Sequence, residues 1–405
     1  MSEAPRIPLP FMIALVANTA LGPAATQLFV PSVPSIAAEF GVPIGIAQIS
    51  FSAAMVALAV STLIYGPLSD RYGRLPMLFA GLVLFMIGTG VALASTDVVM
   101  LIVGRIIQAV GGAAGMVITR AVVRDIYGPE GAARILGTLI VAMVGAPMLS
   151  IVLGGLITDT LGWRWVFVVS LAFSFVVAIL AFATMRGGET GKNTVGGLGG
   201  MLRGYGRLFR SPIYLGFIFQ GGFGAGSFFS FMAVGPYLMV EVLERPATEF
   251  GIYFSLVTLV FMGGNFFGGR LSTHVGLERM VVLGGVAAVT AAALGYGLHE
   301  VFGLGVLVMF GTSFMVSIGN GLAMPNSQAG ALNVIPELAG TASGLAAFVQ
   351  TIFGAIFAQT VASLIDPEGD ILFGAMLLAV GISLLFGLIP FVLKMRAARE
   401  GAAAE

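Results

Sequence analysis

The chain contains no cysteine among its 405 residues. This absence excludes disulfide frameworks, thiolate metal sites and thiol-based redox switches. Charged side chains are also scarce, because Asp, Glu, Lys and Arg make up 9% of the chain, against about 25% in ordinary soluble domains. Apolar residues make up 58%, which is more than one soluble core of this length can bury. The composition therefore indicates a protein whose solvent is a lipid bilayer.

Long apolar runs fill most of the chain. Crossing a bilayer takes roughly 20 apolar residues, and the runs are continuous and rich in Leu, Ala, Met and Gly, which favours helices over strands. We therefore expect an all-α membrane protein with twelve transmembrane helices in two pseudo-symmetric halves of six. The predicted spans are residues 9–31, 46–66, 76–95, 98–120, 135–157, 164–185, 213–240, 250–270, 280–298, 302–325, 340–363 and 371–393.

A short polar sequence occurs twice between apolar runs. GPLSDRYGR begins at residue 66 and GRLSTHVG begins at residue 269, so the offset is 269 − 66 = 203 residues, half of the chain. Duplicated halves of six spans are one of the known ways to build a secondary transporter. We expect residues 1–185 to form the first half, 212–405 the second, and the glycine-rich segment 186–211 to be a cytoplasmic linker.

The distribution of basic residues predicts the orientation. If both termini lie inside, sixteen of the nineteen Lys and Arg residues fall in cytoplasmic loops or at the cytoplasmic ends of spans. Short loops with this bias set the orientation of a membrane protein. We therefore expect an integral protein of a bacterial-type cytoplasmic (inner) membrane, with both termini in the cytoplasm.

The first copy of the repeated sequence combines glycines with charged residues at the membrane face. Gly66 and Gly73 allow tight turns and close helix approach, while Asp70, Arg71 and Arg74 can pair or reach a helix end. This pattern resembles the signature between spans two and three of the major facilitator superfamily. The resemblance implies that Asp70 engages the N-terminal end of the eleventh helix and that these five residues form a cytoplasmic gate.

The fourth span contains two further resemblances. Arg105 and Gln108 match the R-x-x-Q-G pattern of the superfamily, with Ala109 in place of the usual glycine. Arg124 and Asp125 end a sequence that resembles the bicyclomycin and chloramphenicol-resistance branch of the drug:proton antiporters, and their position near the cytoplasmic face favours a structural or gating role over substrate contact. An arginine within a membrane span normally faces the bundle interior or water. The alternative for Arg105 is that it only bonds backbone carbonyls between helices.

The fifth span carries APMLSIVLGG at residues 146–155. It resembles the antiporter signature of the same branch, in which two Ala-Pro pairs precede paired glycines. Pro147, Gly154 and Gly155 are kept, but Ser150 and Ile151 replace the second Ala-Pro pair. Such prolines and glycines bend helices and allow spans to pack closely, so we include the three matching residues among the gating candidates.

The first span departs from the branch at one position. Its relatives carry an Asp before an aromatic-x-Pro sequence, and this chain has Gln27 there, before Phe29 and Pro31. An amide can donate and accept hydrogen bonds but does not titrate. No Asp or Glu falls in the middle of a predicted span. Either coupling to protons runs through peripheral acids, or the protein is a proton-independent facilitator (uniporter) or a metabolite transporter.

Polar side chains within spans are candidates to line a substrate site near the bilayer midplane. For each of them the alternative is an interhelical hydrogen bond. One phenylalanine of the aromatic-rich seventh span is added, because aromatic walls accept amphipathic molecules. The substrate-binding candidates are Asn18, Thr26, Gln27, Arg105, Gln108, Gln220, Phe223, Asn265 and Asn320.

Together these features predict a transporter that moves small organic molecules by alternating access. The family resemblance favours efflux of drugs and antibiotics by proton antiport, and the single deep arginine favours neutral or anionic substrates. An intramembrane enzyme is a remote alternative, because no paired acid, metal cluster or nucleophile with a base occurs within the spans. We expect a small organic substrate, protons as the candidate coupling ion, a monomer in the lipid bilayer, and no cofactor, metal or nucleic-acid partner.

Overall fold

The computed structural model describes residues 8–185 and 198–404. Within them eleven helices are long and apolar enough to cross a membrane, and the stretch Gly145–Leu161 of α5 is a shorter twelfth candidate. The predicted all-α membrane fold is confirmed. In chain order the elements are α1 (Leu9–Phe29), η1 (Val30–Ser32), α2 (Val33–Phe40), α3 (Ile44–Tyr72), α4 (Arg74–Leu93), α5 (Val98–Leu161), α6 (Arg164–Met185), α7 (Leu198–Phe209), α8 (Pro212–Tyr237), η2 (Leu238–Val242), α9 (Ala247–Val275), α10 (Leu277–Phe302), α11 (Val306–Asn333), η3 (Pro336–Leu338), α12 (Ala339–Leu364) and α13 (Asp370–Ala404).

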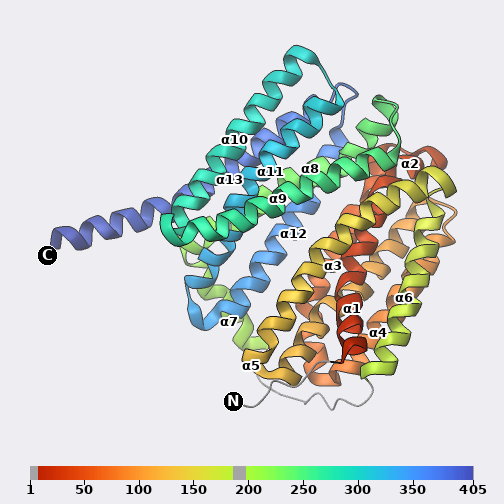
Figure 1. The fold of residues 1–405 in the computed structure, drawn as a ribbon, viewed down its shortest axis with the longest axis horizontal. Helices are drawn as coiled ribbons and strands as arrows, with labels where there is room; N and C mark the ends of the chain where they lie inside the picture. The colour runs from red at the N-terminus through yellow and green to blue at the C-terminus, as the bar shows by residue number, and fades with distance from the viewer. Residues whose placement is uncertain (1–7, 186–197, 405) are drawn as a thin grey trace. The chain divides into compact units, whose positions relative to one another are not determined.

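The helices group into two compact units (Figure 1). The first unit contains the described residues up to Met185 together with Arg245–Ile252, and the second contains the other described residues. In the first unit α5 packs against α1, α3 and α4, and in the second α8 packs against α12 and α13. Of the predicted linker 186–211, residues 186–197 lie outside the described residues, and the remainder includes α7.

Helix α5 contains both the fourth and the fifth predicted span. A Cβ atom added to Gly115 would lie 2.1 Å from the carbonyl oxygen of Asn18, and one added to Gly154 would lie 2.1 Å from that of Leu28. At about 1.5 Å per residue, a straight helix would separate the two glycines by roughly 60 Å and the two α1 residues by roughly 15 Å. The chain therefore reverses direction within α5, and both of its halves lie against α1.

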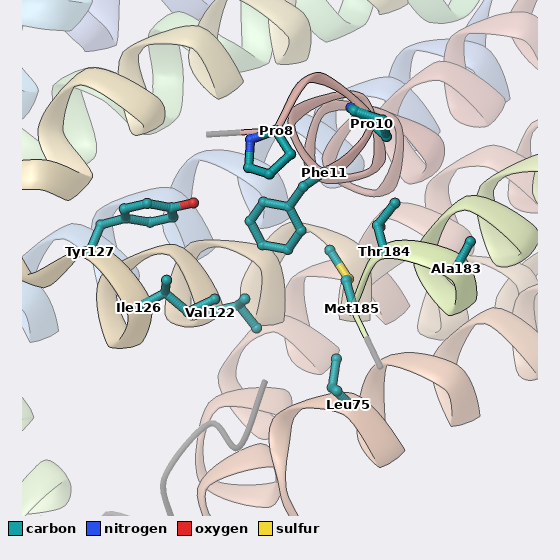
Figure 2. Close-up of a pocket in the computed structure, with 10 residues that line it drawn as sticks. All are labelled: Pro8, Pro10, Phe11, Leu75, Val122, Ile126, Tyr127, Ala183, Thr184 and Met185. Carbon is teal, nitrogen blue, oxygen red and sulfur yellow. The ribbon is translucent and has the colours of Figure 1, made fainter. Parts of the chain in front are cut away.

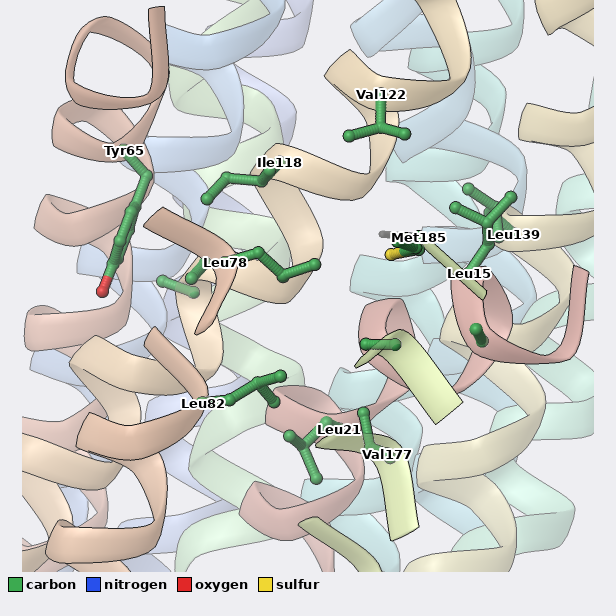
Figure 3. Close-up of a cluster of buried hydrophobic side chains, with 14 of the residues drawn as sticks. Leu15, Leu21, Tyr65, Leu78, Leu82, Ile118, Val122, Leu139, Val177 and Met185 are labelled. Atoms are coloured by element: carbon green, nitrogen blue, oxygen red, sulfur yellow. The ribbon is translucent and has the colours of Figure 1, made fainter. Parts of the chain in front are cut away.

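Apolar side chains from five helices meet in the first unit (Figure 3). Leu15 of α1, Leu78 and Leu82 of α4, Ile118 of α5 and Val177 of α6 are all fully or almost fully buried there. Lipid tails are as apolar as these side chains, so their contacts position the helices through close packing rather than through the hydrophobic effect.

The sequence repeat is also a structural repeat. The turn between α3 and α4 is made at Gly73, with φ 97° and ψ 147°, and the turn between α9 and α10 at Gly276, with φ 95° and ψ 148°. The offset, 276 − 73 = 203, equals the sequence offset. Only glycine adopts this backbone region readily, so both copies require glycine at the turn.

Several helices extend past the predicted spans, and for two of them the reason is the same. The span predicted at 46–66 is α3, which continues to Tyr72, and the span predicted at 302–325 is α11, which continues to Asn333. In both cases polar side chains follow the apolar run, so a prediction based on hydropathy ends the span where they begin. The backbone hydrogen bonds of the helix continue past them, because a polar side chain at the end of a span is compatible with helix.

Candidate substrate-binding and gating residues

Arg105 lies two turns into α5 and is 2% exposed. The helix begins after Asp97, whose side chain accepts a hydrogen bond from the backbone N–H of Met100 at 2.9 Å. An acidic residue at this position satisfies one of the free N–H groups of the first turn and fixes where the helix starts. The guanidinium is thereby placed within the apolar span Val98–Tyr127.

One edge of the guanidinium belongs to a chain of hydrogen bonds between α5 and α4. Arg105 Nη1 donates to Gln108 Oε1, and Gln108 Nε2 donates to Thr89 Oγ1 at 2.9 Å. Thr89 Oγ1 donates in turn to the backbone carbonyl of Phe85 at 2.7 Å. The R-x-x-Q spacing places the first two side chains on one helix face, so the motif builds a fixed support for the arginine.

The other edge of the guanidinium is free. Arg105 Nε and Nη2 are buried and have no hydrogen-bond partner among the described residues, and no described carboxylate forms an ion pair with Arg105. Its Cζ lies 4.2 Å from the centre of the Phe29 ring. A buried cation is stable only with compensating interactions, so this edge can bind an oxygen acceptor or an anionic group.

The three candidates on α1 differ in their bonding. Asn18 Nδ2 donates to the carbonyl of Ala14 at 2.8 Å, and Thr26 Oγ1 donates to that of Gly22 at 2.9 Å. These bonds turn both side chains back onto their own helix. The amide oxygens of Asn18 and Gln27 are buried and have no partner among the described residues. Gln27 is half-buried.

Two of the candidate amides in the second unit tie helices together. Gln220 Nε2 of α8 donates to Ser383 Oγ of α13 at 3.2 Å, and Ser383 Oγ donates back to the backbone carbonyl of Gln220 at 2.8 Å. Asn320 Nδ2 of α11 donates to Ser227 Oγ of α8 at 3.0 Å. The alternative role given above, an interhelical hydrogen bond, therefore accounts for the amide nitrogens of Gln220 and Asn320. The side-chain amide oxygen of Gln220, Oε1, is buried without a described partner.

A small cavity adjoins Asn320 in the second unit. Its walls include Ser227, Ser313 and Ser317, and it has about 10 Å³ of room. This is about enough space for one water molecule, which needs several polar partners, and it is too small for an organic substrate. Asn265 of α9 is half-buried, and its amide oxygen has no described partner.

Phe223 lies in a group of aromatic rings from α8, α12 and α13. Its ring stacks on Phe386 with 5.6 Å between centroids and 12° between planes, and it meets Phe353 edge-on at 4.9 Å and Phe357 edge-on at 5.9 Å. Edge-on and offset-stacked geometries are the favourable ones for aromatic pairs. Phe223 itself is half-buried.

The charged residues of the first repeated sequence form an ion triad with α5. Arg74, which is 4% exposed, pairs with Asp70 of α3 and, at 3.0 Å, with Asp125 of α5. Arg74 Nη1 also donates to Ser69 Oγ at 2.7 Å. Two gating candidates that are 55 residues apart in the sequence are thus joined by Arg74. The triad fixes the α3–α4 turn against the end of the fourth span.

The remaining residues of this motif are outside the triad. Arg71 and Arg124 are exposed, and neither forms an ion pair with a described residue. Gly66 lies within α3, where an added Cβ atom would have nothing within 4 Å. The expectation of a tight turn and close approach at Gly66 is therefore wrong, because the helix continues through the motif and the turn is made at Gly73.

Two of the three fifth-span candidates, the paired glycines, lie where α5 approaches other backbone. Pro147 is half-buried within α5, and Gly154 allows the contact with α1 described above. A Cβ atom added to Gly155 would lie 2.6 Å from the carbonyl oxygen of Ala247. Close packing at the paired glycines is thus the structural consequence of this signature.

Beside these glycines is a functional candidate that the sequence reasoning missed. Asp159 accepts hydrogen bonds from the backbone N–H of Ala247 at 3.1 Å and of Thr248 at 2.8 Å, and from Thr248 Oγ1 at 2.6 Å. The carboxylate therefore caps the positive N-terminal end of α9. Nothing near Asp159 in the sequence indicates this contact, because its partners are 88 and 89 residues away.

Another missed cluster fixes the opposite end of the first unit from the Gly73 turn. Glu39 accepts hydrogen bonds from Trp163 Nε1 at 2.6 Å and from Arg164 Nη1. Arg164 Nη2 also donates to the carbonyl of Ser95 at 3.2 Å, and its guanidinium stacks over the Trp163 ring. The one available signal in the sequence is that Glu39 and Arg164 both lie on the predicted outer side of the membrane and have opposite charges.

The fold and these sites define a polytopic helical membrane protein with a buried, partly unpaired cation and a repeated turn, which is the class of secondary transporters. Residues 15–358 match the sequence model of the Major Facilitator Superfamily. The chain belongs to this superfamily. It is therefore a transporter and not an enzyme, which confirms the predicted class and the resemblance given for the repeated sequence.

Relatives with known names extend along most of the chain. It is 27% identical over 379 residues to a bicyclomycin resistance protein homolog of Haemophilus influenzae, covering 90% of this chain and 92% of that one. It is 25% identical over 385 residues to multidrug resistance protein D of Escherichia coli, covering 95% and 96%. It is 30% identical over 325 residues to a chloramphenicol resistance protein of Pseudomonas aeruginosa, covering 79% and 75%.

Solved structures show the same fold at low sequence identity. The peptide transporter POT in complex with sulfate has a TM-score of 0.76 at 14% identity, with 98% of each chain covered. An inward-facing bacterial homolog of the human lysosomal transporter Spinster has a TM-score of 0.75 at 15% identity, with 96% of each chain covered. These similarities concern the fold alone.

Proposed function

We propose that the chain exports small neutral or anionic organic molecules, antibiotics among them, across the bacterial inner membrane by alternating access. The observation that carries the proposal is the free edge of the Arg105 guanidinium, which is buried within a span and opposed by no described carboxylate. The names of the relatives, which include bicyclomycin and chloramphenicol resistance proteins, support antibiotics as substrates. Both termini are proposed to lie in the cytoplasm, and the monomer is proposed to be the working unit.

The chemistry of Arg105 selects the substrate class. Its two free N–H groups suit a carbonyl, nitro or carboxylate oxygen, and hydrogen bonds to a charged group are worth about 1.5–3 kcal/mol. A cationic drug would meet a like charge in surroundings of low dielectric, where repulsion is strong. The Phe29 ring under the guanidinium supports binding of flat, partly apolar molecules. Gln27, with its free amide oxygen, is a further proposed contact.

We propose separate contacts for an apolar group within the second unit. The half-buried ring of Phe223, which contacts three neighbouring rings, supports its proposed role in binding an aromatic substrate. The free amide oxygens of Gln220 and Asn265 add acceptors. Asn18, Thr26, Gln108 and Asn320 are proposed to act mainly through helix packing or by orienting the other residues, because each bonds within or between helices.

Proton antiport is the proposed coupling, and Asp125 is the proposed carrier. Its carboxylate shares Arg74 with Asp70, so a proton on Asp125 would weaken the ion triad and couple protonation to movement of the α3–α4 turn. Proton-independent facilitation is the second candidate. The specific observation that favours it is Gln27, which cannot titrate at the position of the family acid.

The proposal is tested by comparing a neutral and a cationic drug in proteoliposomes. Wild-type protein is expected to transport chloramphenicol, and Arg105→Ala is expected to lower its kcat/KM by about tenfold or more, as loss of a charge-assisted hydrogen bond requires. Ethidium transport should be weak in the wild type and no weaker in the variant.

Arg207→Ala, which removes an exposed arginine of α7, is the matched control and should transport chloramphenicol normally. Unchanged chloramphenicol kinetics in Arg105→Ala would contradict the assignment of this residue. Preferential transport of ethidium would contradict the proposed substrate class.

A further inference from the structure

The first unit contains a cavity of about 620 Å³ that the proposed transport cycle does not use (Figure 2). It lies where α1 and α4 begin and where the fourth span and α6 end. Its walls are mostly apolar and include Phe11, Leu75, Val122, Ile126 and Met185. Ligand pockets in proteins have about 300–1,000 Å³ of volume and mostly apolar walls with a few polar groups, and this cavity has both properties.

Two hydroxyl groups supply the polar part of the cavity. Figure 2 shows the Tyr127 hydroxyl pointing toward Phe11, and this hydroxyl forms no hydrogen bond with a residue whose side chain the structure describes. Thr184 Oγ1 donates to the carbonyl of Leu180 at 2.7 Å, so its oxygen is left as an acceptor. A bound molecule would thus meet apolar walls with one free donor and one free acceptor.

Among the described residues, the charges near the cavity that form no ion pair are positive. Both neighbouring acids, Asp70 and Asp125, are engaged by Arg74. Arg71 and Arg124 are exposed and pair with no described acid. Arg124 lies one helical turn before Tyr127 on α5, so the two side chains are neighbours on the helix surface. The mouth of the cavity therefore complements an anionic group.

The depth of the cavity in the membrane favours a lipid over a water-soluble ligand. Helices α1 and α4, which contribute to its walls, begin at Leu9 and Arg74, so it lies at the ends of these spans, where lipid headgroups meet the acyl region, and tyrosines are enriched at this level. Ile126 at the rim is 45% exposed, which offers an apolar path from the surrounding lipid into the cavity.

We propose that this cavity holds an acyl chain of an anionic phospholipid whose phosphate is bound by Arg124. The Tyr127 hydroxyl donates to a headgroup or ester oxygen, and the chain occupies the space between Phe11, Val122 and Met185. Electrostatic attraction between a basic side chain and an anionic lipid contributes about 1 kcal/mol, which corresponds to a roughly fivefold change in affinity.

The test is native mass spectrometry of the full chain in detergent micelles, with dioleoylphosphatidylglycerol or dioleoylphosphatidylcholine added. Wild-type protein should retain one phosphatidylglycerol molecule in preference to phosphatidylcholine. Ala183→Trp places an indole at the exposed rim and should lower this retention by about tenfold. Arg124→Ala should lower it by about fivefold and remove the preference for the anionic lipid.

The controls keep the chain folded and the cavity open. Val176→Trp adds the same side chain at an exposed position of α6 outside the cavity lining, and Arg207→Ala removes an exposed arginine of α7. Both should retain phosphatidylglycerol as the wild type does. Melting followed by tryptophan fluorescence checks that every variant is folded, and Ile126→Trp replaces Ala183→Trp if the latter is not.

Equal retention in the wild type and both cavity variants would overturn the proposal, as would equal retention of the two lipids by the wild type. Phosphatidylglycerol retention that is seen only in a variant without residues 2–7 would also overturn it. Such a result would mean that these residues compete with the lipid for the cavity. None of these readouts depends on drug transport, so failure of the proposed function would leave them unaffected.

Discussion

The two copies of the repeated turn have the same backbone and different chemistry. Gly73 and Gly276 have φ values of 97° and 95°, and the serine four positions earlier bonds in the same way in each copy: Ser69 Oγ donates to the carbonyl of Gly66, and Ser272 Oγ to that of Gly269, both at 2.9 Å. The local sequence therefore specifies the same turn twice, whatever charges accompany it.

The charges distinguish the copies. In the first, Arg74 joins Asp70 and Asp125. In the second, Leu277 follows the glycine, and Thr273 Oγ1 bonds only locally, to the Arg270 carbonyl at 2.7 Å and to His274 Nδ1 at 3.0 Å. A duplicated fold has thus kept its backbone turn and placed a buried ionic connection in one copy, so we propose the charge-dependent gating for the first copy.

Removal of Arg74 should have the largest effect. Arg74→Ala leaves two acids without their common partner, and breaking a buried pair costs about 3–5 kcal/mol. We expect about 3 kcal/mol here, since Asp70 is 38% and Asp125 19% exposed, together with a loss of chloramphenicol transport. Melting in detergent, followed by the fluorescence of Trp163 and Trp165, measures the stability. Leu277→Ala, the equivalent change in the second copy, should cost about 1 kcal/mol. Equal losses at the two positions would contradict the asymmetry.

Alanine at either glycine should be destabilising by a similar amount in both copies. The backbone at Gly73 and Gly276 lies in a region that costs another residue about 1–3 kcal/mol, and neither turn can avoid it. Gly66→Ala is the matched control, because its Cβ atom would enter open space within a helix, and it should not be destabilising. The same melting measurement checks the three variants, and a large difference between Gly73→Ala and Gly276→Ala would show that the turns are not equivalent.

Neutralising Asp70 should slow transport more than it lowers stability. Asp70→Asn keeps the size of the side chain, and the partly exposed pair with Arg74 contributes about 1 kcal/mol. We expect about a tenfold lower kcat with substrate affinity unchanged, because we propose that the residue acts in the conformational cycle. Thr273→Asn, at the equivalent position, should transport at the wild-type rate. Normal turnover in Asp70→Asn would remove the gating role.

The smallest effect is expected at the charged pair beside the second turn. Lys394 Nζ of α13 bonds Glu278 Oε1 of α10, and the lysine side chain is 55% exposed. Exposed pairs contribute about 0–1 kcal/mol, so Lys394→Ala should shift the melting temperature little and leave transport intact. Loss of transport in this variant would place a charge-dependent gate in the second copy as well.

Much of the fold could be predicted from the sequence, because length and continuity of apolar runs determine spans and the repeat determines the duplicated turn. The helical state of residues 66–72 could not, since polar residues at the end of a span carry the same hydropathy signal whether they form helix or loop. The reversal within α5 was anticipated only as two separate spans.

The candidate site was predictable only where contacts are local. Arg105 and Gln108 lie three residues apart on one helix, and their pairing follows from that spacing. The contact of Gln108 with Thr89, the pairing of Arg74 with Asp125, and the capping of Ala247 by Asp159 join different helices. Helix packing decides such contacts, and a single sequence carries no direct signal of it.

The most direct test of proton-coupled drug export is transport in proteoliposomes with an internal pyranine probe. Chloramphenicol is added under an imposed proton gradient, and internal pH and drug content are followed together. Antiport predicts that drug movement and proton movement start together, stop together when the gradient is dissipated, and are both lost in Asp125→Asn. Drug exchange that continues unchanged without a gradient would contradict antiport and identify the protein as a facilitator.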